Sequence, residues 1–152
     1  MNRELVKDLF LSLLIVLSQL LIFNHINLFG TVSTFIYVSL FILYKTTYNK
    51  TYLILFGFIV GLIIDLSLQT YGAHTLASIT VCYLKERIEK YSFGVNSTLP
   101  LAMIRGTQLT NRVTYFFLII FLHSLIYFSL IFFKFEFTLT IFLYTLINSI
   151  IN

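Results

Sequence analysis

The carboxylate of Asp65 lies in an otherwise apolar run, residues 57–68, that is expected to cross a membrane. A carboxylate at membrane depth costs roughly 2.5–3.5 kcal/mol on insertion scales. It is retained only where it faces a protein interior or a wet cavity and has a polar partner. Asp65 could therefore carry a proton or an ion, or it could accept hydrogen bonds from Ser, Thr or His on a neighbouring helix. The structural role is the one we favour.

Two glycines share a helix face with this acid. Gly57, Gly61 and Asp65 follow one another at intervals of four residues, which stacks them on one side of an α-helix. Glycines at this spacing allow a second helix to approach closely. That second helix could belong to this chain or to a partner, and we favour a contact inside the bundle. The sequence predicts a tight helix contact that contains the acid.

The three histidines are candidate polar partners. His25 and His74 lie near the ends of apolar runs and could pair with Asp65. Together with Asn24 and Gly72 they are candidates for outer-face architecture or for docking a partner. His123 lies in the middle of an apolar run, where we expect it to bond Ser124, a threonine or a backbone carbonyl.

The residues predict no metal site, no cofactor and no enzyme. A metal site needs three or four ligands that converge on one ion, and three histidines and one buried acid are too few to predict such a site. No nucleophile stands beside a base, since adjacent residues such as His123 and Ser124 point away from each other on a helix. Glu86 and Glu89 stand among Lys85, Arg87 and Lys90, which suggests a solvated, charge-balanced face.

The composition indicates an integral membrane protein. The chain of 152 residues is 59% hydrophobic and 11% charged, and its mean hydropathy is +0.94. A soluble domain carries about 25% charged residues. The formal charge of +4 is spread over loops, which argues against nucleic-acid binding. The single cysteine, Cys82, excludes an internal disulfide and is expected to pack as a small apolar residue.

The apolar runs predict an all-α bundle of about six transmembrane helices in a single multi-pass domain, residues 1–152. The runs are residues 9–29, 35–44, 52–68, 73–84, 113–133 and 137–151. The fourth run would span only ~18 Å of the ~30 Å hydrocarbon layer, as a short inner helix or a re-entrant segment. The sixth run is also short. Residues 85–112 are predicted to form a hydrophilic loop, with a short interfacial helix at 99–104.

Basic residues set the expected orientation. They cluster at Arg3 and Lys7, at Lys45 and Lys50, and in residues 85–112. Intervening segments have few or none. By the positive-inside rule both termini and the large loop lie in the cytoplasm.

Several motifs resemble the rod shape-determining protein MreD family, in its short variants from Gram-negative bacteria. They are N-H-I-N-L-F-G (24–30), F-I-Y (35–37), G-F-I-V-G-L-I-I-D (57–65), T-Y-G-A-H-T-L-A (70–77) and Y-L-K (83–85). The block from Gly57 to His74 is the specific part. The likeness covers most of the chain and is weakest over residues 91–112.

This resemblance implies a non-enzymatic adaptor in the bacterial inner membrane that helps maintain rod shape. Relatives work with MreC and the actin-like MreB, and are linked to the RodA glycosyltransferase and a class B transpeptidase that build lateral peptidoglycan. The family also resembles the substrate-binding membrane subunits of energy-coupling-factor vitamin transporters, a likeness of fold that does not transfer ligand binding. Apart from proteins, the expected surroundings are membrane lipid.

A second function stays open. In a solute-binding transport subunit, Asp65, His74 and Gln19 would line a cavity near the bilayer midplane. Such a protein would bind a small ligand saturably, whereas an adaptor would bind partner helices.

Overall fold

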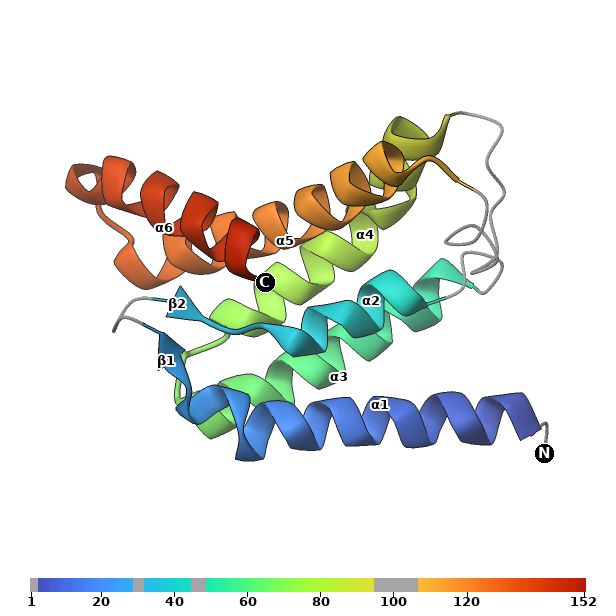
Figure 1. Cartoon of the computed structure of the whole chain (residues 1–152). Coiled ribbons are helices and arrows are strands. Elements are labelled where there is room, and N and C mark those ends of the chain that lie inside the picture. Colours follow the sequence, from blue (N-terminus) through green and yellow to red (C-terminus); the bar gives the residue numbers. More distant parts are fainter. Residues whose placement is uncertain (1–2, 29–31, 45–48, 95–106) are drawn as a thin grey trace.

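The computed structural model describes residues 3–28, 32–44, 49–94 and 107–152, and this part of the chain forms a bundle of α-helices (Figure 1). The helices are α1 (Arg3–Leu21), α2 (Ser39–Leu43), α3 (Lys50–Leu68), α4 (Ala73–Phe93), α5 (Leu109–Phe132) and α6 (Thr138–Ile151). Short 3₁₀ turns are η1 (Phe23–His25), η2 (Ile36–Val38) and η4 (Phe135–Phe137). Between α1 and α2, the two-residue strands β1 (Asn27–Leu28) and β2 (Val32–Ser33) pair antiparallel, with Asn27 opposite Ser33.

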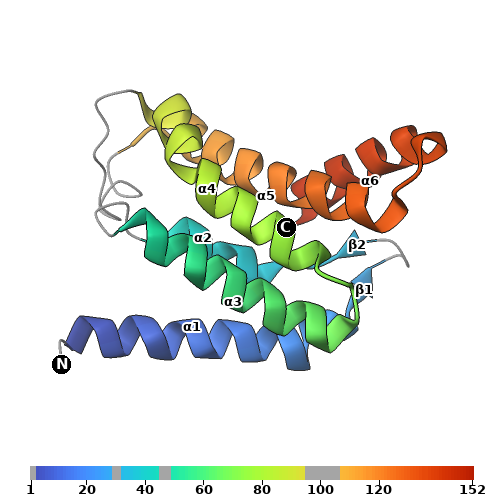
Figure 2. The ribbon, with the colours of Figure 1, turned by 180° about the vertical axis from the view of Figure 1, so that it is seen from behind.

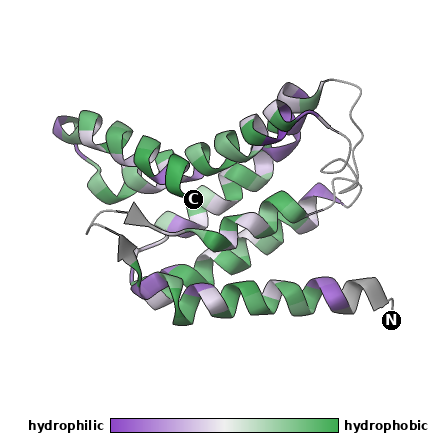
Figure 3. Ribbon diagram, in the orientation of Figure 1, coloured by the Kyte–Doolittle hydropathy of each residue, from purple (hydrophilic) through white to green (hydrophobic). Residues whose placement is uncertain are grey.

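Three segments are long and apolar enough to cross a membrane. They are Lys7–His25, Lys50–Leu68 and Leu109–Phe132. Figure 3 shows apolar residues along most of the length of these helices and hydrophilic residues gathered toward their ends. These features support a helical membrane protein.

Helices α3 to α6 pack in the order of the chain, each against the next. Figures 1 and 2 show α1 alongside α3 on one side of the molecule and α6 on the opposite side. Helix α1 is attached through few residues. Val16 and Gln19 are buried, whereas Phe10, Leu14 and Leu21 on the opposite face are more than half exposed.

The largest fully buried side chains come from η2, α2, α3, α4 and α5, with Ile64 as the contribution of α3. Tyr37, Phe41, Val81 and Ile119 each have 0% of their surface exposed. Helix α6 joins this core with a polar stripe, because Asn148 donates from Nδ2 to Ser124 Oγ on α5 at 3.3 Å. The core therefore contains polar groups as well as apolar ones.

Two predicted spans are shorter in the structure. The helix expected at residues 9–29 ends at Leu21, and the chain continues as η1 and β1. The predicted span 35–44 is helical only as η2 and the five-residue α2. Phe35 has φ −104° and ψ 57°, which is outside the helical region, so a continuous helix cannot begin before it. This half of the chain is less helical than its hydropathy suggests.

The fourth segment is longer than the predicted run of residues 73–84. Helix α4 continues to Phe93 and has 21 residues, about 31 Å at 1.5 Å per residue. The predicted loop 85–112 is therefore helical at its start, and α5 begins inside its other end, at Leu109. The hydropathy fell at Lys85 because charged residues follow, not because the helix ends. The expected interfacial helix at 99–104 lies outside the described residues.

Candidate functional site

The carboxylate of Asp65, in the last turn of α3, binds the first turn of α4. Its Oδ1 accepts from the backbone N–H of His74 at 3.0 Å, and its Oδ2 accepts from the N–H of Thr75 at 2.8 Å. The Thr75 hydroxyl donates to Oδ2 at 2.5 Å, and the Thr70 hydroxyl donates to Oδ1. The N-terminus of a helix has unpaired N–H groups and a partial positive charge. Asp65 therefore supplies the cap for α4 from another helix.

A four-residue turn makes this cap possible. Gln69, Tyr71 and Gly72 all have positive φ angles, of 55°, 52° and 93°. Glycine adopts such angles without strain, and at Gly72 a side chain would be strained. Gly72 precedes the first residue of α4, and no side chain at this position caps the helix. The turn brings the start of α4 directly over Asp65.

Gly57 and Gly61 lie in the contact between α3 and α4. A Cβ at Gly61 would stand 2.6 Å from Cα of Thr75, and one at Gly57 would stand 2.6 Å from Sγ of Cys82. Both distances are shorter than any normal contact, so the two helices approach as closely as these residues allow. The glycine face points into the bundle.

His74 and His123 are joined through one hydroxyl. Tyr37, on η2, has its Oη 2.9 Å from Nδ1 of His74 and 2.6 Å from Nε2 of His123. All three side chains are 0% exposed. The His74 ring does not bond the Asp65 carboxylate, as the sequence suggested it could; only its backbone N–H does. His123 bonds Tyr37, so the expected bond to Ser124, a threonine or a carbonyl is wrong.

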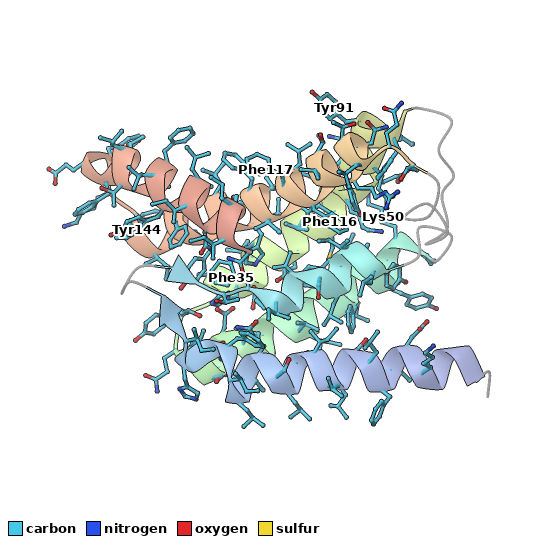
Figure 4. All side chains as sticks on the ribbon, in the orientation of Figure 1. Phe35, Lys50, Tyr91, Phe116, Phe117 and Tyr144 are labelled. Carbon is cyan, nitrogen blue, oxygen red and sulfur yellow. The ribbon has the colours of Figure 1, made fainter. Side chains whose placement is uncertain are left out.

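Two aromatic rings enclose this polar trio. Phe35 meets the ring of His74 edge-on at 5.5 Å between centroids and that of His123 at 5.0 Å. The ring of Tyr127 lies over His74 at 4.4 Å. Figure 4 shows Phe35 in the interior of the bundle, between α6 and the N-terminal half of the chain. The polar trio is thus shielded by apolar ring surface.

Gln19 ties α1 to the segment before α2. Its Nε2 donates to Oδ1 of Asn24 at 2.8 Å and to the carbonyl of Thr34 at 2.9 Å. Its Oε1 accepts from the N–H of Tyr37 at 3.3 Å. Asn24 in turn donates to Ser67 Oγ at 3.5 Å. These amides hold the N-terminal helix against the bundle.

The four residues expected at the outer face do not form one cluster. His25 is exposed and Asn24 and Gly72 are half-buried, whereas His74 is completely buried among aromatic rings. The sequence analysis did not identify Tyr37 as the partner of His74 and His123, although a buried tyrosine hydroxyl normally has a hydrogen-bond partner. That rule was the available signal.

A second buried polar group lies near the other end of α4. Lys85 Nζ is 3.0 Å from Glu89 Oε1 and donates to the carbonyl of Tyr44 at 2.6 Å. Tyr115 Oη on α5 donates to the same Glu89 oxygen at 3.2 Å. The predicted solvated face is therefore wrong for Lys85 and Glu89, which lie on the inner side of α4. It does describe Glu86 and Lys90, an ion pair with each side chain 48% exposed.

A groove of about 740 Å³ opens elsewhere, between η2 and α2, the start of α5 and the end of α6. Phe116, Phe117 and Ile120 line it from α5, and Figure 4 shows both phenylalanines on that helix. Ser39 and Ser149, which also line it, donate to backbone carbonyls at 2.6 Å each. The lining contains none of Gln19, Asp65 and His74.

Within residues 3–28, 32–44, 49–94 and 107–152, no group of three His, Cys, Asp or Glu side chains could hold a metal ion. The chain matches no protein-family model, and no curated protein or solved structure is significantly similar to it. The chemistry of the site therefore follows from its own contacts. These contacts are hydrogen bonds that join one helix to another.

Proposed function

We propose that this chain is a membrane adaptor of the bacterial cell-elongation machinery, which binds an MreC-type partner and helps maintain rod shape. The support from the sequence is the MreD-like block from Gly57 to His74. The support from geometry is that this block forms a helix hairpin whose polar groups bond within the chain. Partner recognition then rests on the outer faces of the helices, and MreB, RodA and a class B transpeptidase are reached through the first partner.

The finer architecture is part of this proposal. The chain passes the inner membrane about six times, both termini are cytoplasmic, and the bundle is similar to the membrane subunits of energy-coupling-factor transporters. In this proposal the second pass is the segment 32–44, of which only η2 and the five-residue α2 are helical, and the sixth pass is the 14-residue α6. Basic residues at one end of the helices, such as Lys50, Arg87 and Arg112, favour that end as the cytoplasmic one.

One observation favours an adaptor over a transport subunit. Gln19, Asp65 and His74, the residues that would line a ligand cavity, are at most 5% exposed. Asp65 is held by backbone and hydroxyl groups of α4 and its preceding turn, and the Gln19 amide bonds Asn24 and the backbone at Thr34 and Tyr37. A polar group that binds a solute must exchange such bonds for the ligand. Here the polar groups stabilise the fold.

The transport function remains the second candidate because of the groove. Its volume of about 740 Å³ is in the range of small-molecule pockets, roughly 300–1,000 Å³. Its lining is mainly apolar, and a vitamin-like solute requires several convergent polar groups for orientation. A saturable small-molecule ligand in this groove is the finding that would favour this candidate.

Site-specific photo-crosslinking separates the two functions. A photoreactive amino acid is placed at Leu14 on α1, at Phe117 in the groove, or at Leu139 on α6. Leu14 is 52% exposed, Leu139 is 78% exposed, and Phe117 is partly exposed. The tagged protein is irradiated in membranes of a rod-shaped bacterium, purified in mild detergent, and its adducts are identified by mass spectrometry. We expect MreC at one of these positions and not at the other two.

Each outcome of this experiment has a meaning. A face-specific MreC adduct supports the adaptor and locates its docking surface. An ATP-binding-cassette coupling module in place of MreC, or a bound small molecule at Phe117, contradicts the adaptor and favours transport. The tagged protein without the photoreactive residue is the control for adducts that do not depend on contact.

A further inference from the structure

The hydroxyl of Tyr37 connects two histidines from two other elements of the fold. We propose that His74, Tyr37 and His123 form one buried site that binds a single exchangeable proton. The three side chains come from α4, η2 and α5 and are all 0% exposed. This property does not depend on the adaptor function, which uses the outer faces of the bundle.

The hydrogens of this trio can be counted. The Tyr37 hydroxyl has one hydrogen, and its oxygen can accept. Ser78 Oγ, on α4, has no hydrogen-bond partner in the described residues, and the two histidines are the groups that contact the Tyr37 hydroxyl, so its hydrogen goes to one ring and its oxygen accepts from the other. Both contacts, at 2.9 and 2.6 Å, are therefore satisfied only if one of the facing nitrogens, His74 Nδ1 or His123 Nε2, carries a hydrogen and the other does not. The tautomers of the two rings are coupled through Tyr37.

This coupling also determines which of the two outer nitrogens carries a hydrogen. A neutral imidazole has one N–H, so the histidine that donates to Tyr37 has a bare outer nitrogen, and the other has an outer N–H. The outer nitrogens are His74 Nε2 and His123 Nδ1. Both are buried and have no hydrogen-bond partner in the described part of the chain. The bare one is the position where a proton can be added.

The first added proton keeps both inner bonds. It binds the lone pair of the bare outer nitrogen, and that ring becomes an imidazolium which still donates to Tyr37. The only lone pair left for a second proton is on the facing nitrogen that accepts from the Tyr37 hydroxyl. Protonation there would remove that hydrogen bond. The trio therefore takes up a first proton without breaking a bond within it, against the cost of a buried charge, and a second only by also losing a buried hydrogen bond.

The neighbouring groups favour His74 as the charged ring. The titratable groups that surround the trio are Asp65 on α3, Cys82 on α4 and Tyr127 on α5. From α1 the neighbour is the Gln19 amide, which does not titrate. Asp65 accepts four hydrogen bonds, as an ionised carboxylate does, and one of them comes from the backbone of His74. A positive charge is therefore more stable on His74 than on His123.

The test is ¹⁵N NMR of histidine-labelled protein in lipid nanodiscs. A His25→Gln background removes the exposed third histidine. Near pH 8 we expect one of the two facing nitrogens to carry a hydrogen and the other to carry none. As the pH is lowered to about 4 and below we expect the first imidazolium of each chain to form on His74, while His123 stays neutral. Hydrogens on both facing nitrogens or on neither, or two independent protonations, would overturn the proposal.

Two tyrosine variants provide the matched comparison. Tyr37→Phe removes the bridging hydroxyl, and we expect the two rings to choose tautomers and bind protons independently. Tyr127→Phe keeps its ring over His74 and removes a hydroxyl that does not bond the trio, so we expect the wild-type pattern. Histidine spectra of Tyr37→Phe that equal those of the wild type would contradict the coupling. If Tyr37→Phe does not fold, the wild-type tautomers alone decide.

Discussion

Asp65 acts on a helix other than its own. Most helices are capped by a side chain directly before the first turn, and α4 has Gly72 there, which offers none. The carboxylate reaches across the turn from α3 and satisfies two N–H groups that would otherwise be buried without acceptors. A charge at membrane depth is tolerated because it is fully bonded and lies at the positive end of a helix dipole.

Replacing Asp65 separates the charge from the cap. We expect Asp65→Ala to lower the free energy of unfolding by roughly 2–3 kcal/mol, because two backbone donors and two hydroxyls lose their acceptor. Asp65→Asn keeps one oxygen and should cost less, about 1 kcal/mol. Unfolding by SDS in mixed micelles, followed by circular dichroism, measures both. Equal costs for the two variants would mean that the cap is not the main role of this residue.

Some of this residue-level detail could be predicted from the sequence. The helical period places Gly57, Gly61 and Asp65 on one face, and all three are buried in the structure. The partners of Asp65 could not be predicted, because they depend on a turn with three positive φ angles. The bonds of His74 and His123 depend on Tyr37, which is 37 and 86 residues away along the chain. Local patterns carry no information on such distances.

At the scale of elements, α3 and α4 share the most extensive contact between described helices, and Gly57 and Gly61 lie in it. Gly61 lies against backbone atoms of α4, and Gly57 lies against a side chain, the thiol of Cys82. Backbone cannot move without displacing the whole helix, whereas a side chain can be shortened. The two glycines therefore differ in how well a larger residue can be accommodated.

A double-mutant cycle tests this difference. We expect Gly61→Ala to destabilise the protein by about 1–3 kcal/mol, with no simple rescue. Gly57→Ala should also destabilise it, but Cys82→Ala in the same chain should restore most of the loss, because the remaining neighbours, the carbonyl oxygen of Ser78 at 3.4 Å and Cβ of Cys82 at 3.5 Å, are at ordinary contact distances. The free energies of unfolding of the two single variants and the double variant give the coupling. Additive effects of Gly57→Ala and Cys82→Ala would show that the thiol is not the obstacle.

The inner and outer faces of α4 carry two ion pairs at the same spacing. The side chains of Lys85 and Glu89 are 3% and 11% exposed, and those of Glu86 and Lys90 are 48% exposed. Removing one partner of a buried pair costs roughly 3–5 kcal/mol, and an exposed pair contributes at most about 1 kcal/mol. We expect Lys85→Met to be strongly destabilising and Lys90→Met nearly neutral, in the same unfolding assay. Similar values for both variants would contradict the burial of Lys85.

The lengths of the helices could be predicted from the sequence only in part. Hydropathy located α3, α5 and α6 well, since apolar residues fill these helices almost from end to end. It ended the fourth segment too early because the charged last turns of α4 read as a loop. It made the second span a single α-helix because residues 35–44 are apolar except for Ser39, although they form a 3₁₀ turn and a short α-helix. Composition reports the environment of a segment and not its backbone conformation.

At the scale of the whole molecule, the positions of the basic residues and the arrangement of the helices favour the same orientation in the membrane. Figure 1 shows the N-terminus, the start of α3 and the end of α4 at one end of the bundle, and the turns after α3 and α5 at the other. Figure 4 shows Lys50 and Tyr91 near that first end. Lys50 Nζ stands 4.3 Å from the centre of the Tyr83 ring, a cation and an aromatic residue side by side as membrane interfaces favour. The proposed orientation has this end in the cytoplasm.

Cysteine labelling in intact cells tests that orientation. Tyr71 and Phe135, 101% and 99% exposed, lie in the two turns proposed to be outside, and Tyr91, 78% exposed, lies near the cytoplasmic end of α4. We expect a membrane-impermeant maleimide to label Tyr71→Cys and Phe135→Cys in intact spheroplasts, and Tyr91→Cys only after permeabilisation. Cys82 is 1% exposed, so the unmodified chain should stay unlabelled and serve as the control.

Two results would contradict this topology. Labelling of Tyr91→Cys from outside would mean that the orientation is reversed, and labelling of Phe135→Cys only from inside would mean that α5 does not cross the membrane completely. Because an MreC-type partner has to meet the bundle with the same orientation, either result would also count against the proposed adaptor.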